Sequence, residues 1–397
     1  MTNLFDELKL EPRILLGPGP SNISPSVVQA MAAPLMGYLD PDFVKVMDDV
    51  QEMLRLVFRL NNGFAFPVSG TGTAGMEATI ANITEPDDVI IIAANGFFSQ
   101  RMTEMVKRHG GIPKVLEIPW GEPVTVDILE KELKQHSKVK AVTIVHAETS
   151  TGVLTPLPDL SHLIHSYDAL LLVDAVTSLC GSELDMDSWG IDLCYSASQK
   201  CVGTPPGLSP VGISSRAMDI IRARKDSLRT WYLDLSLLEQ YWSQGVDTPN
   251  RVYHHTAPIS MIYGLREALR LVLEEGLENR INRHITNAKA LRAGIRALGL
   301  NLLVDDPHWL PQLTTVGIPD GIDDAQVRRR LLRESNIEIG GGLGEFKGNT
   351  WRIGLMGEAS KATNVLNLLE KLEIILSSEG FDVAHGAAVS AATELLG

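Results

Sequence analysis

Asp174 and Lys200, two ionisable residues near the middle of the sequence, have types and a spacing that suit chemistry on a bound ring. Asp174 ends the apolar run Leu170–Val173, which places its carboxylate where strand ends of an α/β sheet meet their ligands. Lys200 follows 26 residues later, which is enough for the chain to leave the sheet once and return to it. A lysine amine can form a Schiff base with an aldehyde, and a carboxylate can keep a ring nitrogen protonated. Taken alone, Asp174 would more simply be a strand-end turn or a helix cap.

A glycine-rich segment, Ser69–Gly75, is a candidate phosphate site. It contains a GxGxxG spacing and opens a predicted helix, whose first N–H groups and dipole can bind an anion. A dinucleotide site would need an acidic residue about 20 positions further on, but the next predicted strand, Asp88–Ala93, runs into Ala-Asn-Gly. The segment therefore favours the phosphate of a mononucleotide-sized cofactor, with Thr71, Gly72 and Thr73 as contacts. A plain structural turn is the alternative.

The segments between these motifs alternate between helix-like and strand-like patterns, as in an α/β sheet. Short apolar runs bounded by turn or polar residues predict buried strands, because they are too short for typical helices. The chain between them is long enough for crossover helices, which parallel strands require. The predicted strands are Asp88–Ala93, Ala141–His146 and Ala169–Val173, and the predicted helices are Asp42–Arg59, Gln100–His109 and Asp127–Gln135. The predicted fold class is α/β with a mostly parallel central sheet.

The sequence changes character after Glu275, where the long helical pattern Leu277–Leu298 begins. The later segments mix strand and helix patterns and predict a smaller C-terminal α+β domain. They are the strands Gln312–Ile318 and Trp351–Met356 and the helices Asp323–Ser335 and Lys361–Ser378, with a flexible loop at Gly340, Gly341, Gly342 and Gly344. We therefore predict an N-terminal arm (1–20), a large domain (21–275) and a small C-terminal domain (276–397). The Ala-rich tail after Phe381 has no predicted structure.

Composition narrows the possible partners and the location. The 397 residues have a formal net charge of −14, which opposes binding to nucleic acid and to anionic lipid surfaces. No apolar run approaches the ~20 residues needed to span a bilayer. The N-terminal residues MTNLFDELKLEPR lack the apolar stretch of a secretory signal and the pattern of a transit peptide. We therefore expect a cytoplasmic protein with no nucleic-acid or membrane partner.

Two groups of side chains could act outside the candidate site. The three cysteines, Cys180, Cys194 and Cys201, have no CxxC spacing and are interpreted as reduced and mostly buried thiols. A basic cluster lies in the predicted helix Asp323–Ser335 and is interpreted as a solvated helix face, with an interaction patch as the alternative. The cluster consists of Arg328, Arg329, Arg330 and Arg333.

Eight short motifs, taken in order, resemble those of class V aminotransferases of the alanine–glyoxylate and serine–pyruvate type. They cover nearly the whole chain. They are GPGPSN (Gly17–Asn22), SGTG (Ser69–Gly72), NGFFSQR (Asn95–Arg101), HAETSTGV (His146–Val153), VDAV (Val173–Val176), SQK (Ser198–Lys200), YHHT (Tyr253–Thr256) and WRIGLMG (Trp351–Gly357). The resemblance implies an aspartate-aminotransferase-like fold, pyridoxal 5′-phosphate as cofactor, and a homodimer whose active sites lie partly across the subunit interface.

The resemblance also implies a role for each matching residue in cofactor binding. Lys200 would form the Schiff base, Asp174 would contact the pyridine nitrogen, and Thr149 would lie near the phenolic oxygen of the ring. Phe98 and Val176 would pack on the two ring faces. The residues implied at the phosphate are Thr71, Gly72, Thr73 and Gln199, with Tyr253 and Thr256 reaching it from the partner subunit.

For the substrate, the resemblance implies an arginine that binds the α-carboxylate. Arg352 would do this through its planar fork of donors, while Gly37 and Tyr38 would help to set the size of the substrate side chain. No second arginine is identified by a motif for a side-chain carboxylate. The implied reaction is therefore transfer of the amino group of alanine or serine to glyoxylate or a similar 2-oxo acid, in a ping-pong cycle. An apolar pocket rejects an added hydroxyl only weakly, so alanine and serine are not ranked.

Several alternatives remain at this stage. A serine–pyruvate enzyme or another class V enzyme is possible, such as a desulfurase or lyase, which would need a nucleophilic cysteine on a mobile loop. A non-catalytic relative of the fold and a dinucleotide oxidoreductase are further alternatives. Phe98 stands where some relatives have tryptophan and Thr73 where some have histidine, which weakens the assignment to a subfamily.

The adjacent His254 and His255 suggest metal binding at first sight. Successive residues of a strand point to opposite faces, so a shared metal ion is not expected and both histidines are interpreted as packing residues. No metal site is predicted.

Overall fold

The central element of the structure is a seven-stranded sheet. The computed structural model describes residues 7–243, 251–304 and 307–396, so the start of the N-terminal segment discussed above and the last residue lie outside the described residues. The strand order is β2-β10-β9-β8-β5-β3-β4. All neighbours from β9 to β4 pair in parallel, and only β10 runs antiparallel to both of its neighbours. The strands are β2 (Gly63–Ser69), β10 (Leu208–Ser214), β9 (Leu193–Tyr195), β8 (Leu170–Asp174), β5 (Ala141–Val145), β3 (Val89–Ala94) and β4 (Ile112–Glu117). The mostly parallel α/β sheet is thus confirmed.

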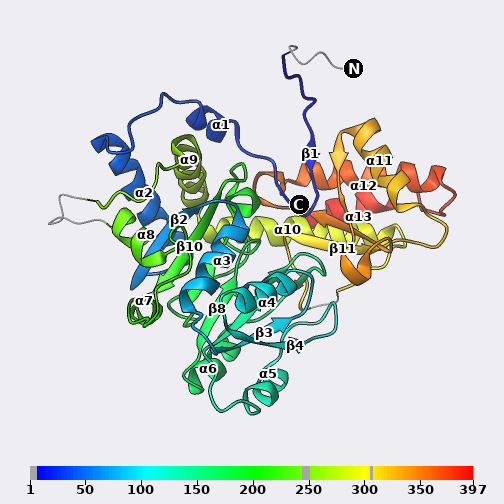
Figure 1. The fold of residues 1–397 in the computed structure, drawn as a ribbon. Coiled ribbons are helices and arrows are strands. Elements are labelled where there is room, and N and C mark those ends of the chain that lie inside the picture. Colours follow the sequence, from blue (N-terminus) through cyan, green and yellow to red (C-terminus); the bar gives the residue numbers. More distant parts are fainter. Residues whose placement is uncertain (1–6, 244–250, 305–306, 397) are drawn as a thin grey trace.

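The inner strands are continuous apolar runs because they are covered on both faces. Every residue of β5 and β8 is buried, as expected for parallel strands between layers of helices. Figure 1 shows α3 and α4 in front of this sheet, with α2 and α9 beside its β2–β10 edge. The surrounding helices are α1 (Pro25–Met31), α2 (Pro41–Phe58), α3 (Gly72–Ile83), α4 (Ser99–Arg108), α5 (Val126–Leu133), α6 (Pro158–Ser166), α7 (Ser215–Arg222), α8 (Leu235–Trp242) and α9 (Ile259–Glu275).

Local signals set the ends of α2. The side chain of Asp40 accepts a hydrogen bond from the backbone N–H of Asp42, a residue followed by the apolar positions that face the core. The helix ends at Phe58, and the capping residue Arg59 adopts a left-handed conformation with φ 51°. These signals explain why the predicted helix Asp42–Arg59 agrees with the observed one within one residue.

A second group of elements follows α9 and forms its own hydrophobic core, separate from that of the central sheet. A three-stranded antiparallel sheet in the order β11-β14-β13 packs against the helices. In Figure 1 these elements lie on the right, with α10 running toward them from the central sheet. They are α10 (Leu277–Ala297), β11 (Leu313–Gly317), α11 (Asp324–Ser335), β12 (Ile337–Glu338), β13 (Gly340–Gly341), β14 (Thr350–Gly354), α12 (Ala362–Ser378) and α13 (Ala387–Leu396). The predicted division at residues 20 and 275 stays a prediction.

The N-terminal segment joins this second group. Strand β1 (Ile14–Leu15) pairs in parallel with β12, with Ile14 opposite Ile337. The next residue, Leu16, is fully buried in the second core. The arm therefore connects the second core to the segment that continues toward Lys200.

One prediction for the C-terminal part is wrong, and one segment for which no structure was predicted is helical. Gly340 and Gly341 form β13, which pairs with β14, and are not a flexible loop. The glycines allow close approach, since a Cβ at Gly342 would overlap the Phe346 carbonyl. The Ala-rich tail forms α13, where Ala388 and Ala392 are fully buried against α10 and α12.

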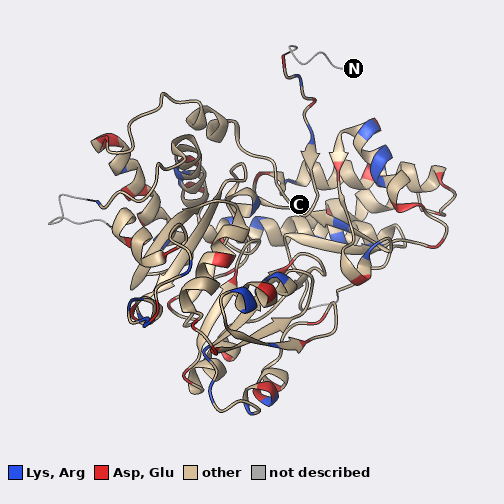
Figure 2. Ribbon diagram, viewed as in Figure 1, with Lys and Arg blue, Asp and Glu red and all other residues tan. Residues whose placement is uncertain are grey.

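The basic cluster lies on α11 and is partly paired with acids. Figure 2 shows blue residues on this helix among red ones. Arg328 pairs with Asp324 at 2.7 Å, and Arg330 pairs with Glu334 and Glu379. These ion pairs agree with the interpretation as a solvated helix face. Among the described residues, no helix is both long and apolar enough to cross a membrane.

Candidate active site

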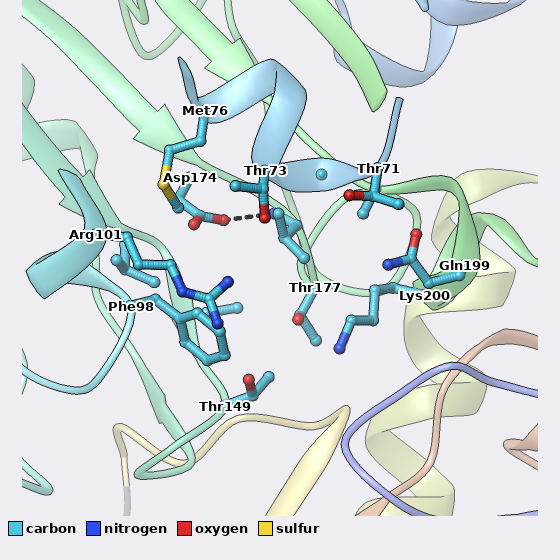
Figure 3. Close-up of a pocket in the computed structure, with 15 residues that line it drawn as sticks. Thr71, Thr73, Met76, Phe98, Arg101, Thr149, Asp174, Thr177, Gln199 and Lys200 are labelled. Carbon is cyan, nitrogen blue, oxygen red and sulfur yellow. Dashed lines mark hydrogen bonds between the residues drawn. The ribbon is translucent and has the colours of Figure 1, made fainter. Parts of the chain in front are cut away.

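A cavity of about 150 Å³ lies at the carboxyl ends of β5 and β8, beside the first turn of α3 (Figure 3). This is the edge of a parallel sheet where ligands usually bind. Nine of the predicted site residues line it: Thr71, Gly72, Thr73, Phe98, Thr149, Asp174, Val176, Gln199 and Lys200. The other lining residues are Met76, Arg101, Val145, Ala147, Thr177 and Ala197.

Asp174 is a buried carboxylate with two donors. Its Oδ2 accepts a hydrogen bond from the Tyr195 hydroxyl at 2.7 Å, and its Oδ1 accepts one from the backbone N–H of Val176 at 2.8 Å. Burial raises its pKa to about 6, although both hydrogen bonds and the positive charges of Lys200 and Arg101 oppose this shift. The carboxylate is therefore ionised at neutral pH, with no described cation bonded to it.

Lys200 lies in an irregular turn, Ser198–Val202, directly after β9. Its Nζ donates to the carbonyl oxygen of Pro18. Burial lowers its pKa to about 8, so a substantial fraction of the amine is neutral near pH 8. Ser21, the residue directly after the arm, is hydrogen-bonded to this turn. Its backbone N–H donates to Gln199 O at 3.0 Å and its hydroxyl donates to Lys200 O at 2.9 Å.

The first turn of α3 faces the same cavity and fits a phosphate group. Thr71 is the N-cap residue, and its side chain makes no capping hydrogen bond in the described structure, so N–H groups of the first turn are open to an anion. Gly72 is tightly placed, because a Cβ there would lie 2.9 Å from Ala197 Cβ and 3.3 Å from Val176 Cγ2. Gln199 also lines the cavity, and its side-chain amide NH₂ group can donate a hydrogen bond to a phosphate oxygen.

Arg352 lies on β14 next to Thr149 and outside the residues that line the cavity. The residue is 7% exposed, and its guanidinium is held by two backbone carbonyls. Nε donates to Gly341 O at 2.7 Å and Nη1 donates to Thr149 O at 3.2 Å. Burial lowers its pKa to about 10, which still leaves it charged at neutral pH. No bond from Nη2 to a described residue is present, so this edge of the fork can take a carboxylate.

Apart from Arg352, four predicted site residues do not line the cavity of their own chain. Gly37, Tyr253 and Thr256 are exposed and Tyr38 is half-buried. The rings of Tyr38 and Tyr253 are 4.9 Å apart, and the Tyr253 and Thr256 hydroxyls are 3.2 Å apart. Together they form a surface of this chain, away from its own cavity lining.

The two histidines before Thr256 are closer together than predicted. His254 Nδ1 and His255 Nδ1 are 2.8 Å apart, because this segment is not a strand and does not alternate its side chains. His254 stacks on Trp231 with ring centroids 4.1 Å apart, and His255 Nε2 lies 2.6 Å from Ser69 Oγ. The geometric reason given for opposite faces is therefore wrong. Within the described residues, no group of three or more possible ligands is placed to hold a metal ion.

Sequence reasoning missed three ionisable residues at the site, although Arg101 and Glu148 stand in the motifs NGFFSQR and HAETSTGV. Tyr195 is the donor to Asp174. Arg101 lines the cavity, with its guanidinium carbon 5.4 Å from the centre of the Phe98 ring. Glu148, directly before Thr149, is fully buried. Motif spacing could have singled out Arg101 and Glu148, but nothing local indicates what they contact.

The cysteines are excluded from the chemistry of the cavity by burial. All three are buried, and none lines the cavity. Burial raises the pKa of Cys201, the residue after Lys200, to about 11, so its thiol is protonated at neutral pH. The site thus offers an amine, a carboxylate and an anion-binding helix end, and these groups fit pyridoxal phosphate.

Comparison with known proteins agrees with this chemistry. Residues 15–345 match the family Aminotransferase class-V. The chain is 39% identical to (S)-ureidoglycine–glyoxylate transaminase of Bacillus subtilis (strain 168), over 96% of this chain and 95% of the relative. It is 38% identical to alanine–glyoxylate aminotransferase of Felis catus, over 93% of this chain and 89% of the relative.

A solved structure gives the same result for the fold. The alanine–glyoxylate aminotransferase of Nostoc sp. superimposes with a TM-score of 0.91 and 48% sequence identity, over 94% of this chain and 98% of that chain. Fold and site define a pyridoxal-phosphate enzyme with an aspartate-aminotransferase-like fold. The chain belongs to the class V aminotransferase family, and its cofactor is pyridoxal phosphate.

Proposed function

We propose that this aminotransferase moves the amino group of a small amino acid, alanine or serine, to glyoxylate or a similar 2-oxo acid in a ping-pong cycle. The observation that supports this most directly is the position of Arg352. Its guanidinium is fixed by Gly341 O and Thr149 O, beside the cavity that holds Lys200. A fork held in this way suits the α-carboxylate that all amino-acid and 2-oxo-acid substrates share.

Pyridoxal phosphate supplies an aldehyde that condenses with amines and a ring that accepts the electrons of the substrate Cα–H bond. Lys200 would hold the cofactor, and its free amine would move the proton of the substrate Cα as a general base. Its pKa of about 8, lowered by burial, suits this task near neutral pH. Asp174 would keep a proton on the pyridine nitrogen, and Thr149 would lie near the phenolic oxygen.

The remaining lining residues position the ring and its phosphate. Phe98 and Val176 would pack on the two ring faces, while the first turn of α3 would bind the phosphate. Thr71, Gly72, Thr73 and Gln199 make these phosphate contacts. Gly37 and Tyr38 lie away from the cavity of their own chain, so they would restrict the substrate side chain in the site of the opposite subunit.

A ureidoglycine-type donor is the second candidate, and Arg101 is the observation that favours it. This arginine lines the cavity, and no hydrogen bond or ion pair to a described residue is present for its guanidinium. Such a group can bind a carbonyl or carboxylate on the distal part of a larger donor. The similarity to a ureidoglycine–glyoxylate transaminase points in the same direction.

Absorbance spectra of the purified enzyme test the reaction. L-Alanine, L-serine or (S)-ureidoglycine is added first, and glyoxylate afterwards. The band of the lysine-bound cofactor should bleach with the true donor and return with glyoxylate, and Lys200→Ala should lack the band. The second candidate would instead be supported if Arg101→Met loses turnover of the ureido donor but turns over alanine at the wild-type rate. An enzyme whose band survives all three donors would refute both.

We further propose a homodimer with shared sites. The supporting observation is an exposed aromatic surface: Tyr253 is 52% exposed and Trp231 59% exposed, and ring contacts through His254 connect Trp231 with Tyr232. Burial of such a surface favours association. In the dimer, Tyr253 and Thr256 reach the phosphate of the opposite subunit.

Subunit mixing tests the shared site. Lys200→Ala removes the lysine from one chain, and a Tyr253→Ala/Thr256→Ala double variant weakens the donated phosphate contacts of the other. Each variant alone should have little activity. Refolding them together should restore activity, because the Lys200→Ala chain donates an intact Tyr253 and Thr256 to a site with an intact lysine. A mixed dimer that forms without any recovery would contradict shared sites.

A further inference from the structure

Glu148 is a fully buried carboxyl group that the mechanism above does not use. It is 0% exposed, and it immediately precedes Thr149, which lines the cavity. Its Oε1 accepts hydrogen bonds from the backbone N–H of Ser150 at 2.8 Å and from the Ser150 hydroxyl at 2.6 Å. Its Oε2 is buried and has no hydrogen-bond partner among the described residues. A buried carboxyl with one unpaired oxygen needs an explanation.

The bonds of Glu148 connect two parts of the site. The Ser150 hydroxyl that donates to Glu148 also accepts the backbone N–H of Phe97 at 3.0 Å. Phe97 precedes Phe98, the residue proposed to stack on the ring. There is no room to replace Gly96, because a Cβ there would overlap the Glu148 carboxyl group. The carboxyl group therefore lies directly against the loop that carries Phe98.

The charged and titratable groups that interact with Glu148 come from several elements. Asp174 at the end of β8 is the acidic neighbour. Lys200, Arg352 and the Tyr195 hydroxyl also interact electrostatically with the Glu148 charge. Burial raises the pKa of Glu148 to about 7, and the Asp174 charge adds to this shift. The hydrogen bonds from Ser150 and the nearby backbone N–H of Phe98 oppose it. An ionised Glu148 would thus offset part of the positive charge of Arg352.

We propose that Glu148 is a positioning residue that couples substrate binding to proton uptake: it is neutral when Arg352 holds a substrate carboxylate and ionised when that carboxylate is absent. The proposal rests on the proposed role of Arg352. A substrate carboxylate at Arg352 brings a second negative charge toward Glu148, and like charges favour protonation of the weaker acid. Protonated Glu148 then leaves the full charge of Arg352 to the substrate, while its Oε1 keeps the Ser150 bonds.

The coupling predicts a particular pH dependence of binding. As the pH rises through about 7, ionised Glu148 competes with the substrate for Arg352, so the KM for the amino acid rises while kcat changes little. If binding of the substrate carboxylate shifts the pKa of Glu148 by one unit, KM changes about tenfold. Glu148→Gln, which is permanently neutral and has the same shape, should keep a low KM across this range. Titration of Lys200 and of the substrate amine affects the KM of both enzymes equally. These effects therefore cancel when the KM of the wild type is divided by that of Glu148→Gln at each pH.

Calorimetry on the holoenzyme gives a readout that does not depend on turnover. Propionate, which has the carboxylate of alanine but no amine, is titrated near pH 7 in buffers of different ionisation enthalpy. The wild type should take up a fraction of a proton on binding propionate, and Glu148→Gln should take up none. Ser150→Ala keeps the carboxyl group but loses a hydrogen bond that lowers its pKa, so the proton uptake should persist and move to higher pH.

The outcomes separate this proposal from the proposed function. Equal proton uptake and equal KM profiles in the wild type and Glu148→Gln would overturn the coupling, even if alanine is transaminated and Arg352→Ala abolishes propionate binding. If Glu148→Gln does not fold, an uptake profile that is identical in Ser150→Ala and the wild type would overturn it in the same way. Propionate binding that survives Arg352→Ala would instead refute the role of Arg352.

Discussion

Tyr195→Phe removes one hydroxyl donor from Asp174 and leaves the rest of the site in place. The hydroxyl donates to Asp174 Oδ2 at 2.7 Å, while Oδ1 keeps the Val176 N–H at 2.8 Å. A hydrogen bond to an ionised group contributes about 1.5–3 kcal/mol, and one pKa unit corresponds to 1.36 kcal/mol. Loss of this donor should therefore raise the pKa of Asp174 by about one to two units.

The rate should follow the ionised fraction of Asp174. With a pKa of about 6, about nine tenths of the carboxyl is ionised at pH 7. With a pKa of about 7 to 8, that fraction falls to between about a half and about a tenth. In the proposed mechanism only the ionised form stabilises the proton on the pyridine nitrogen, so the donor half-reaction at pH 7 should slow by about two- to tenfold. A carboxyl group with a raised pKa ionises again at higher pH, so the rate should recover there.

Stopped-flow measurement of the half-reaction with L-alanine, from about pH 6 to about pH 9, checks this. The useful quantity is the rate of the variant divided by that of the wild type, since the titration of Lys200 affects both. Tyr263→Phe is a matched control, because its hydroxyl donates only weakly to Pro34 O, at 3.4 Å. A ratio for Tyr195→Phe that stays constant with pH would refute the reasoning, even if the rate itself is lower.

Three further predictions concern the cofactor site and the second core. Gly72→Ala should weaken pyridoxal phosphate binding at least about tenfold in a spectroscopic titration, because its Cβ would lie 2.9 Å from Ala197 Cβ; unchanged affinity would contradict the tight packing. Deleting residues 385–397 removes α13 and should lower the thermal midpoint by roughly 5–10 °C in calorimetry, whereas an unchanged midpoint would show that α13 adds no stability. His284, whose pKa burial lowers to about 3, accepts the Gly357 N–H at Nε2 and must stay neutral when folded. Below about pH 6.5 this histidine therefore takes up a proton only in the unfolded state. Protonation of this group should lower the unfolding free energy of the wild type by about 2 kcal/mol at pH 5. Urea titrations measure this loss, and His284→Gln should not show it.

The sequence predicted the parts of the site that depend on continuous local patterns. The apolar run before Asp174 is a strand because both faces of the sheet are covered, and the glycine-rich segment opens α3, whose first turn lines the cavity. Both features are encoded within a few residues. The corresponding strand and helix predictions therefore agree with the structure to within a few residues.

The tail and the glycine loop were predicted less well, because tertiary packing decides their structure. An Ala-rich segment has helix propensity but no pronounced apolar stripe, and α13 forms where Ala388 and Ala392 fit against α10 and α12. Gly340 and Gly341 resemble a loop in composition. They are a strand because β14 supplies a partner and Pro18 lies against Gly340.

The partners of the catalytic groups could not be predicted, because they come from distant segments. Lys200 lies against Pro18 and Ser21, about half of the chain away, and these two residues follow the strand that joins the arm to the second core. No periodicity reports a contact at such a separation. The arm is thus part of the active site as well as of the second core. Any change that loosens the pairing of β1 with β12 should therefore alter Lys200 before it alters the central sheet.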